Sequence, residues 1–117
     1  MNDMALNNKT ISLVKAEAVK LAKQLMKSEL KEVILYGSSA RGDYTDDSDI
    51  DIALLTECDR IEVKKYDDAL AQIATDFAMK YLVIVNFVCL PYDEFVEKKT
   101  WYAYFKNIET EGEVLYG

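Results

Sequence analysis

Residues 37–51 contain the side chains of this chain that are best suited to chemistry. Gly37 and Ser38 form a small turn whose backbone N–H groups could bind a phosphate. Ten residues separate Ser38 from Asp49, and Asp49 and Asp51 then open an apolar run. The first half of the stretch suits a phosphate group and the second half suits a divalent cation. Nucleotidyl transfer needs both.

The two aspartates are two residues apart on an expected strand. Their side chains therefore point to the same face, with Cα atoms about 6–7 Å apart. Carboxylates this close repel each other, and the chain contains no histidine to neutralise them. Mg²⁺ would remove the repulsion, since it typically takes one or two protein carboxylates together with phosphate oxygens. The alternative is an exposed strand face with two solvated aspartates, which is the commoner meaning of Asp-x-Asp alone.

The turn before the aspartates makes the cation site the better interpretation. Gly37 lets a phosphate approach the backbone closely, and Ser38 can donate both its N–H and its hydroxyl. A Gly-Ser dipeptide by itself is more often an ordinary turn between strands. The complete pattern of Gly-Ser, ten residues and Asp-x-Asp should arise by chance in on the order of one chain in a thousand. The spacing therefore predicts a phosphate site joined to a metal site.

Composition restricts the remaining possibilities. The chain has 117 residues, which suits one domain, and carries a net charge of −7. The acidity argues against strong binding of nucleic acid and fits a metal cleft, a basic partner or simply a soluble surface. The lack of histidine excludes a Ser-His-Asp triad, histidine-ligated zinc and an imidazole base. Cys58 and Cys89 are isolated, and no apolar run spans a bilayer, so we expect a cytoplasmic protein without membrane contact.

Hydrophobic periodicity predicts a compact α/β domain over residues 1–117, with residues 1–9 frayed. The expected elements are a helix from an N-cap at Thr10 to about Ser28, strands 32–36 and 49–55 joined by a turn over 38–48, a helix over 59–80, a buried central strand over 81–90, helices 92–98 and 101–109, and a last apolar segment 114–116. The second strand should alternate, with Ile50, Ile52 and Leu54 on one face and Asp51 and Ala53 on the other.

Aromatic residues are concentrated in the last two expected helices: Tyr92, Phe95, Trp101, Tyr102, Tyr104 and Phe105. Such a cluster could form a face that stacks on a base or docks a partner. Helical aromatic residues more often close a core, and we favour that interpretation. Tyr44, beside the phosphate turn, either lines the mouth of the site or is an ordinary turn residue.

Several segments resemble a known family. Gly37-Ser38, Ala40-Arg41-Gly42 and Ser48-Asp49-Ile50-Asp51 resemble the signature of the polymerase-β-like nucleotidyltransferase superfamily, Gly-Ser-x10-Asp-x-Asp. The chain looks most like the smallest members, the minimal nucleotidyltransferases. The downstream segments 85–88, 92–95 and 107–116 resemble the third strand and the tail of that family, so the resemblance covers about residues 30–117.

The resemblance implies a small mixed β-sheet flanked by helices and a defined set of ligands. Gly37 and Ser38 would hold the triphosphate of ATP or another nucleoside triphosphate, and Asp49 and Asp51 would hold two Mg²⁺ ions about 4 Å apart. The reaction would transfer a nucleoside monophosphate to an acceptor hydroxyl and release pyrophosphate. Arg41 could reach a phosphate oxygen.

Two alternatives qualify the assignment. As an ordinary surface arginine, Arg41 would instead pair with Asp43 or Asp46. The second concerns a missing carboxylate. The family usually carries a third carboxylate on the strand after the crossover helix, and here Asn86 stands at the position that matches it. An amide can accept a hydrogen bond or weakly ligate a cation but cannot accept a proton. Asn86 could equally be a strand asparagine bonded to neighbouring backbone, and Asp93 could replace it only if the chain doubled back.

Three functional hypotheses follow from these residues and the resemblance. Minimal nucleotidyltransferases are often encoded beside small helical HEPN proteins, and some act as antitoxins that adenylylate them. The resemblance therefore implies a Mg²⁺-dependent transfer, most simply of AMP from ATP, to a HEPN-type toxin. A second hypothesis is a module that has lost turnover at Asn86 and neutralises a partner by occlusion. The third is a small α/β domain with a coincidental motif.

Overall fold

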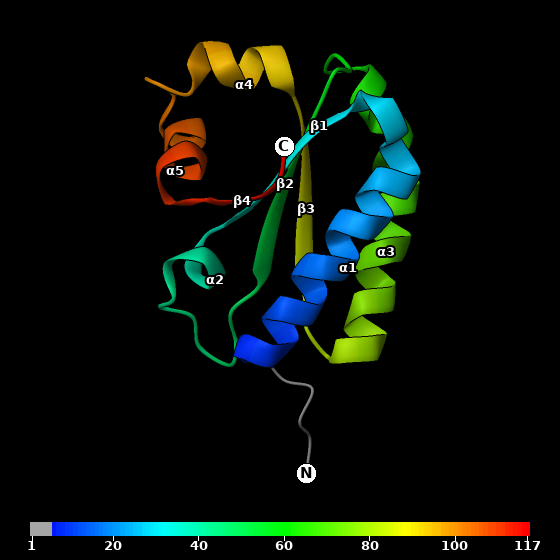
Figure 1. The fold of residues 1–117 in the computed structure, drawn as a ribbon, viewed down its shortest axis with the longest axis vertical. Helices are drawn as coiled ribbons and strands as arrows, with labels where there is room; N and C mark the ends of the chain where they lie inside the picture. The colour runs from blue at the N-terminus through cyan, green and yellow to red at the C-terminus, as the bar shows by residue number, and fades with distance from the viewer. Residues whose placement is uncertain (1–5) are drawn as a thin grey trace.

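A four-stranded mixed sheet in the order β3-β2-β1-β4 organises the chain (Figure 1). The computed structural model describes residues 6–117. Strand β1 is antiparallel to both β2 and β4, whereas β2 and β3 are parallel. The elements are α1 (Asn8–Met26), η1 (Lys27–Glu29), β1 (Leu30–Tyr36), α2 (Ser38–Arg41), β2 (Ile50–Thr56), η2 (Glu62–Tyr66), α3 (Asp67–Tyr81), β3 (Val85–Pro91), α4 (Tyr92–Lys98), α5 (Ala103–Glu111) and β4 (Glu113–Tyr116). This architecture confirms the small mixed sheet flanked by helices.

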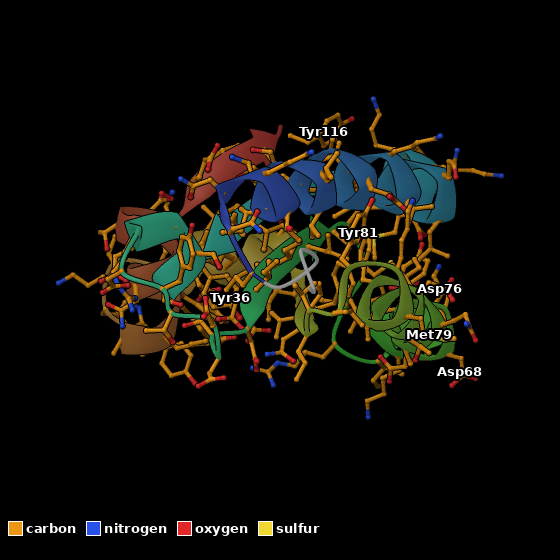
Figure 2. All side chains as sticks on the ribbon, turned by 90° about the horizontal axis from the view of Figure 1, so that it is seen from below. Tyr36, Asp68, Asp76, Met79, Tyr81 and Tyr116 are labelled. Carbon is orange, nitrogen blue, oxygen red and sulfur yellow. The ribbon has the colours of Figure 1, made fainter. Side chains whose placement is uncertain are left out.

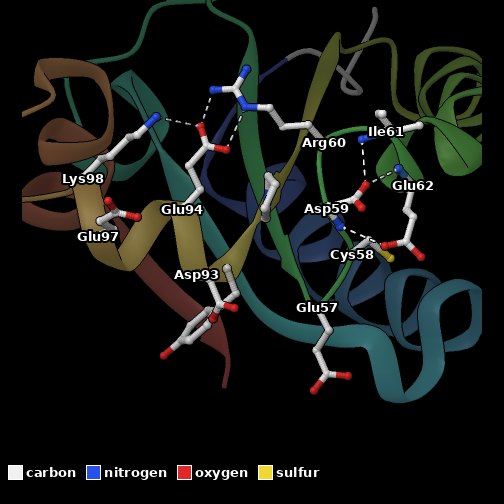
Figure 3. Close-up of a pocket in the computed structure, with 12 residues that line it drawn as sticks. Glu57, Cys58, Asp59, Arg60, Ile61, Glu62, Asp93, Glu94, Glu97 and Lys98 are labelled. Atoms are coloured by element: carbon white, nitrogen blue, oxygen red, sulfur yellow. Dashed lines mark hydrogen bonds and ion pairs between the residues drawn. The ribbon is translucent and has the colours of Figure 1, made fainter.

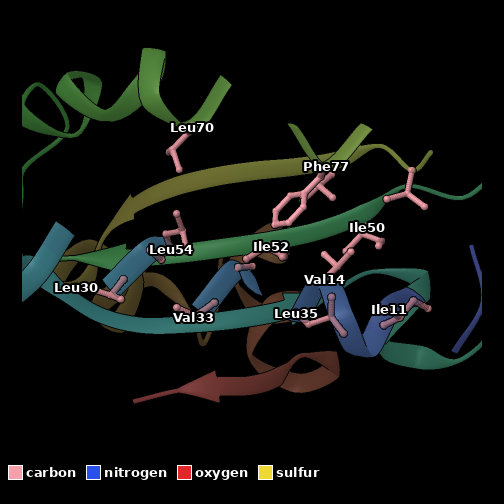
Figure 4. Close-up of a cluster of buried hydrophobic side chains, with 14 of the residues drawn as sticks. Ile11, Val14, Leu30, Val33, Leu35, Ile50, Ile52, Leu54, Leu70 and Phe77 are labelled. Atoms are coloured by element: carbon pink, nitrogen blue, oxygen red, sulfur yellow. The ribbon is translucent and has the colours of Figure 1, made fainter. Parts of the chain in front are cut away.

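The sheet separates two hydrophobic clusters. Helices α1 and α3 cover one face, and α4 and α5 cover part of the other (Figure 1). Strand β2 contributes to both clusters: Ile52 and Leu54 point to α1 and α3 (Figure 4), whereas Ala53 and Leu55 point to α4 and α5. All four are fully buried. The predicted alternation is confirmed, and it fixes the register of β2 because a slip of one residue would exchange its two faces.

The first helix begins earlier than its sequence pattern predicts. Asn7, not Thr10, is the N-cap, because the Asn7 side chain accepts a hydrogen bond of 2.8 Å from the Thr10 backbone N–H. Leu6 is buried, so the prediction of a frayed end is wrong for residues 6–9. Residues 1–5 of that prediction lie outside the described part of the chain. Helix α1 ends at Met26, and across residues 6–117 no helix has the length and apolarity needed to cross a membrane.

The predicted central strand over residues 81–90 is wrong in both extent and position. Helix α3 continues through Tyr81 and ends at Leu82, which has a left-handed φ of 58°. Strand β3 therefore starts only at Val85, and it lies at an edge of the sheet. Its apolar composition has another cause: Phe87 packs against the α3 cluster and Val88 against the α5 cluster. An edge strand with both faces covered has the same composition as a central one.

Two smaller corrections concern the ends of elements. The predicted helix over 59–80 is divided into η2 and α3, and Ile61 is 79% exposed instead of buried. Residues 113–116, expected only as an apolar segment, form β4 beside β1. Gly112 makes this turn possible, because a Cβ there would lie 2.3 Å from the Ile108 carbonyl oxygen and 2.5 Å from Ile34 Cγ2.

Truncation of the buried strand tests this packing. We expect Leu54→Ala to lower the free energy of unfolding by about 2–5 kcal/mol, because it leaves a cavity between β2 and α3. Leu13→Ala on α1 removes the same atoms from a side chain that is 43% exposed, and it should cost less than about 1 kcal/mol. Urea denaturation followed by circular dichroism compares the two. Equal losses would contradict the placement of Leu54 in the core.

Candidate functional site

The turn between β1 and α2 requires a glycine. Gly37 has a φ of 77°, a region that other residues rarely adopt, and it immediately precedes the short helix α2. A Cβ at Gly37 would lie only 2.6 Å from Asp51 Oδ2. The backbone of the turn and one of the two predicted metal ligands are therefore in direct contact. Because the first N–H groups of a helix have no partner within it, Ser38 lies where such groups are available.

Strand pairing brings the predicted site residues together. Tyr36 on β1 is opposite Asp51 on β2, and Asp51 is opposite Asn86 on β3. Asp49 directly precedes β2. The Asn86 side-chain amide donates hydrogen bonds to Asp49 Oδ2, at 2.9 Å, and to Asp51 Oδ1, at 3.2 Å. The two carboxylates thus converge on one point, and Asn86 bonds to them instead of to neighbouring backbone.

The electrostatics of this point favour a cation. Burial raises the pKa of Asp51 above its ordinary value, the hydrogen bond from Asn86 partly opposes the rise, and the charge of Asp49 adds to it. A divalent cation would relieve both the burial of the charge and the repulsion. Two carboxylates and the carbonyl oxygen of an amide are oxygen ligands of the kind that Mg²⁺ prefers. The donor set fits Mg²⁺, although residues 6–117 contain no cluster of three or more carboxylate, thiol or imidazole ligands.

Arg41 is held by carboxylates on the surface. Its Nε lies 3.2 Å from Asp43 Oδ2, and one terminal nitrogen lies 3.0 Å from Glu111 Oε1. These contacts, led by the one with Asp43, raise the pKa of Arg41. The ion pair with Asp43 is the contact expected if Arg41 were an ordinary surface arginine and not a phosphate ligand. Asp46 makes no ion pair with it, and Glu111, on α5, was not anticipated because nothing in the sequence places α5 beside α2.

The loop between α2 and β2 is held by hydrogen bonds at both ends. The Tyr44 hydroxyl donates a hydrogen bond to Asn8 Oδ1 at the start of α1. The Thr45 N–H donates to Ser48 Oγ at 2.9 Å, and the Ser48 N–H donates to the Thr45 carbonyl at 3.1 Å. These bonds hold the residues immediately before Asp49, so the loop positions the first aspartate.

Two nearby groups were missed by sequence reasoning. The Tyr36 and Tyr104 hydroxyls share a hydrogen bond of 2.9 Å, which joins α5 to the strand end beside Asp51. Burial, and then the bond to Tyr104, raise the pKa of Tyr36. The Ser39 hydroxyl is buried and has no hydrogen-bond partner within residues 6–117. Adjacency to Gly37 and Ser38 was the only sequence signal for Tyr36 and Ser39.

The aromatic cluster belongs only partly to the core. Phe95 and Phe105 are buried and pack with ring centroids 5.4 Å apart, as predicted. Trp101, Tyr102 and Tyr104 are exposed by 65%, 46% and 39%, so the core interpretation is wrong for these three. They lie at and near the start of α5, where the connection from α4 keeps them outside the sheet.

A hollow lies away from the motif, at the opposite end of the sheet. It encloses about 680 Å³ between the segment after β2 and helix α4 (Figure 3). Arg60 and Lys98 form ion pairs with Glu94 there, and Asp59 accepts hydrogen bonds from the Ile61 and Glu62 backbone. The lining also includes Asp93. The chain does not double back, so Asp93 cannot replace the missing third carboxylate.

Comparisons with known proteins agree with this geometry. A model of the nucleotidyltransferase domain family matches residues 16–111. A relative from Methanocaldococcus jannaschii, named "Putative protein adenylyltransferase MJ0604", is 35% identical over 100 residues, which are 86% of this chain and 92% of that protein.

Solved structures share the fold. One, described as a toxin-antitoxin with AMP-PNP, has a TM-score of 0.57 and 25% identity over 88% of this chain and 73% of that one. Another, a tri-AMPylated Shewanella oneidensis HEPN toxin in complex with MNT antitoxin, has a TM-score of 0.52 and 23% identity over 91% and 71%. The family match over most of the chain, on a fold that brings its motif together, shows that this protein belongs to the nucleotidyltransferase domain family.

Proposed function

We propose that this nucleotidyltransferase transfers AMP from ATP to a hydroxyl group of a protein, a small helical HEPN-type toxin, and so acts as its antitoxin. The observation that carries the proposal is the convergence of Asp49 and Asp51 on one point beside the Gly37 turn. The relative named as a protein adenylyltransferase supports AMP and a protein acceptor. The similar structure of an AMPylated HEPN toxin with its antitoxin supports the class of partner.

Each residue has a role in this reaction. Gly37 and Ser38 hold the triphosphate through backbone N–H groups and the serine hydroxyl. Asp49 and Asp51 would hold Mg²⁺, which would supply positive charge beside the reacting phosphate. Asn86 keeps the two carboxylates together in the absence of the ion. Rotation of its amide would turn Oδ1 toward the same point, where an oxygen can ligate a cation.

The transfer exchanges one bond for another at the α-phosphorus. The acceptor oxygen forms a bond to this phosphorus while the bond to pyrophosphate breaks. The hydroxyl proton passes to solvent, because Asn86 cannot accept it, the chain has no histidine, and Asp49 and Asp51 would be bound to the cation. Positioning and charge stabilisation are then the main contributions of the protein to the rate. We place the reaction in the cytoplasm, consistent with the two free cysteines.

One observation favours a second candidate function. The Asn86 amide occupies the point where the carboxylates converge, and it satisfies both of them with hydrogen bonds. A site whose carboxylates already have hydrogen-bond donors could bind a partner, with or without a nucleotide. It would then neutralise the partner by occlusion, without turnover. The net charge of −7 suits a basic partner under either proposal.

Transfer of labelled AMP distinguishes the two proposals. With Mg²⁺, ATP and the HEPN-type partner, we expect the native chain to label the partner and Asp51→Asn to lower the rate about 100-fold or more, because it removes a cation ligand. Asn86→Asp should raise the rate by supplying the third carboxylate. If only the Asn86→Asp variant transfers AMP, the occlusion proposal is correct and the enzyme proposal for the native chain is wrong.

A pair of glycine variants tests the contact between the turn and the aspartate. Gly37→Ala should abolish AMP transfer, since its Cβ would displace the Asp51 carboxylate. Gly42 has a φ of 88°, but a Cβ there would meet nothing within 4 Å. Gly42→Ala therefore adds only the strain of a left-handed backbone, about 1–2 kcal/mol, without the collision. Gly37, at φ 77° and ψ −158°, lies in a region that is essentially confined to glycine, so Gly37→Ala adds backbone strain to the collision. Gly42→Ala should retain transfer. Equal activities of the two variants would argue against the role of this contact.

The cation site can be tested without turnover. Mg²⁺ at saturating concentration should raise the melting temperature of the native chain by about 2–8 °C, because the ion binds only the folded state. Asp51→Asn should remove this increase, whereas Asp93→Asn, at the other end of the sheet, should preserve it. Differential scanning calorimetry with and without Mg²⁺ makes the comparison. An unchanged increase in Asp51→Asn would place the ion elsewhere.

A further inference from the structure

The outer edge of β3 carries backbone groups that no other segment of residues 6–117 pairs with. Strand β3 is the last strand on its side of the sheet. The Ile50 N–H donates to the Ile84 carbonyl at 2.8 Å, and hydrogen bonding alternates along a parallel pair. Asn86 and every second residue after it therefore bond to β2. The N–H and C=O groups of Val85, Phe87 and Cys89 point away from the sheet.

This edge lacks the features that usually prevent pairing. Residues 85–90 include no charged side chain, and the register with β2 continues from Val85 to Pro91 without a bulge. The first residue that opposes strand addition is Pro91, at the far end. Native edge strands are commonly protected by lysine, proline, bulges or a covering element. Helix η2 lies beside the far end of β3, where Val63 and Lys64 line a hollow together with Cys89 and Leu90. The part of the edge that begins at Val85 is suited to pairing with another strand.

A hollow runs beside the edge. It encloses about 300 Å³ between β3 and α3 and is lined by small or apolar residues that include Ala71, Ala74 and Phe87. Two exposed apolar residues come before β3 in the chain. Ile84 is 59% exposed, and Met79, on the outer side of α3 (Figure 2), is 77% exposed. The alanines leave room for the side chains of an added strand, and the exposed apolar residues extend the surface beyond it.

The same edge leads to the candidate active site. Asn86 lines the hollow and contacts both Asp49 and Asp51. A further strand would lie about 4.8 Å beyond β3. The residue of that strand beside Asn86 could point its side chain to the face on which the aspartates lie. The free edge and the catalytic residues therefore form one continuous surface.

We propose that the β3 edge binds an extended, net basic segment of the acceptor protein as a fifth strand, which delivers its hydroxyl-bearing side chain to the site. This inference rests on the proposed function, since it identifies how the protein acceptor is held. Charge favours this occupant: the chain has a net charge of −7, and Asp67 stands in the hollow. A second copy of the chain would bring the same negative charge and be repelled.

Amide exchange measured by NMR tests the pairing directly. In the free chain the amides of Val85, Phe87 and Cys89 should exchange fast, while those of Asn86 and Val88 should be protected by β2. Addition of the HEPN-type partner should slow the first three about tenfold or more. The alternation within one strand shows at the same time that β3 is folded.

A groove-filling variant tests the consequence for catalysis. Ala71→Trp should occupy the hollow and lower AMP transfer to the partner about tenfold or more, with unchanged binding of Mg²⁺ and ATP by calorimetry. Ala16→Trp is the matched control, because Ala16 is an exposed alanine on α1. It should leave both transfer and binding at the native level.

The outcomes separate this inference from the proposed function. If the native chain transfers AMP and Ala71→Trp does so equally well, without protection of the edge amides, the docking surface is wrong and the function stands. If the partner protects the edge amides but receives no AMP, the function is wrong and the surface stands. Slow exchange at the edge in the chain alone, with the mass of a dimer by light scattering, would assign the edge to a second copy and overturn the inference.

Discussion

The candidate site depends on the lateral alignment of three strands. Tyr36, Asp51 and Asn86 stand side by side on β1, β2 and β3, and the Gly37 turn follows the first of them. A shift of β2 by one residue would turn Asp51 to the opposite face. The shift is prevented because β2 is buried on both faces, with Ile52 and its neighbours completely enclosed. The hydrophobic core therefore determines where the carboxylates meet, although no core side chain takes part in the chemistry.

The motif could be predicted from sequence because its spacing is local. Gly37 and Asp51 are joined by one segment, residues 38–50, so their residue types and separation carry most of the geometry. Helix α4 was predicted at its observed bounds, Tyr92–Lys98, and Pro91 is its N-cap. The edge position of β3 and the strand β4 could not be predicted, since both depend on the order of strands in the sheet. The apolar composition of a strand indicates that it is buried, but it does not indicate how many strands lie beside it in the sheet.

Side-chain contacts between residues far apart in the sequence could not be predicted from it either. Arg41 reaches Glu111 across 70 positions, and Tyr36 reaches Tyr104 across 68. Both contacts attach α5 to the site end of the sheet. A different network closes the far end, where burial and hydrogen bonding to Glu29 raise the pKa of Tyr66 and Glu94 pairs with Arg60. The hollow at that end is thus lined by charges that have partners. At the site end, within the described residues 6–117, the side-chain amide of Asn86 holds the two carboxylates together.

The amide at Asn86 explains how the two carboxylates can lie together in the folded chain without a cation. A third carboxylate there would place three negative charges around one point, beside an Asp51 whose pKa burial already raises. An amide donates to both aspartates instead, so each carboxylate has a hydrogen-bond donor and no third negative charge is added. The same substitution removes a proton acceptor and a strong cation ligand. Asn86 therefore holds the two carboxylates together in the free chain. Under the proposed function, catalysis would depend more heavily on the position of the acceptor hydroxyl, which an ordered strand along β3 would provide.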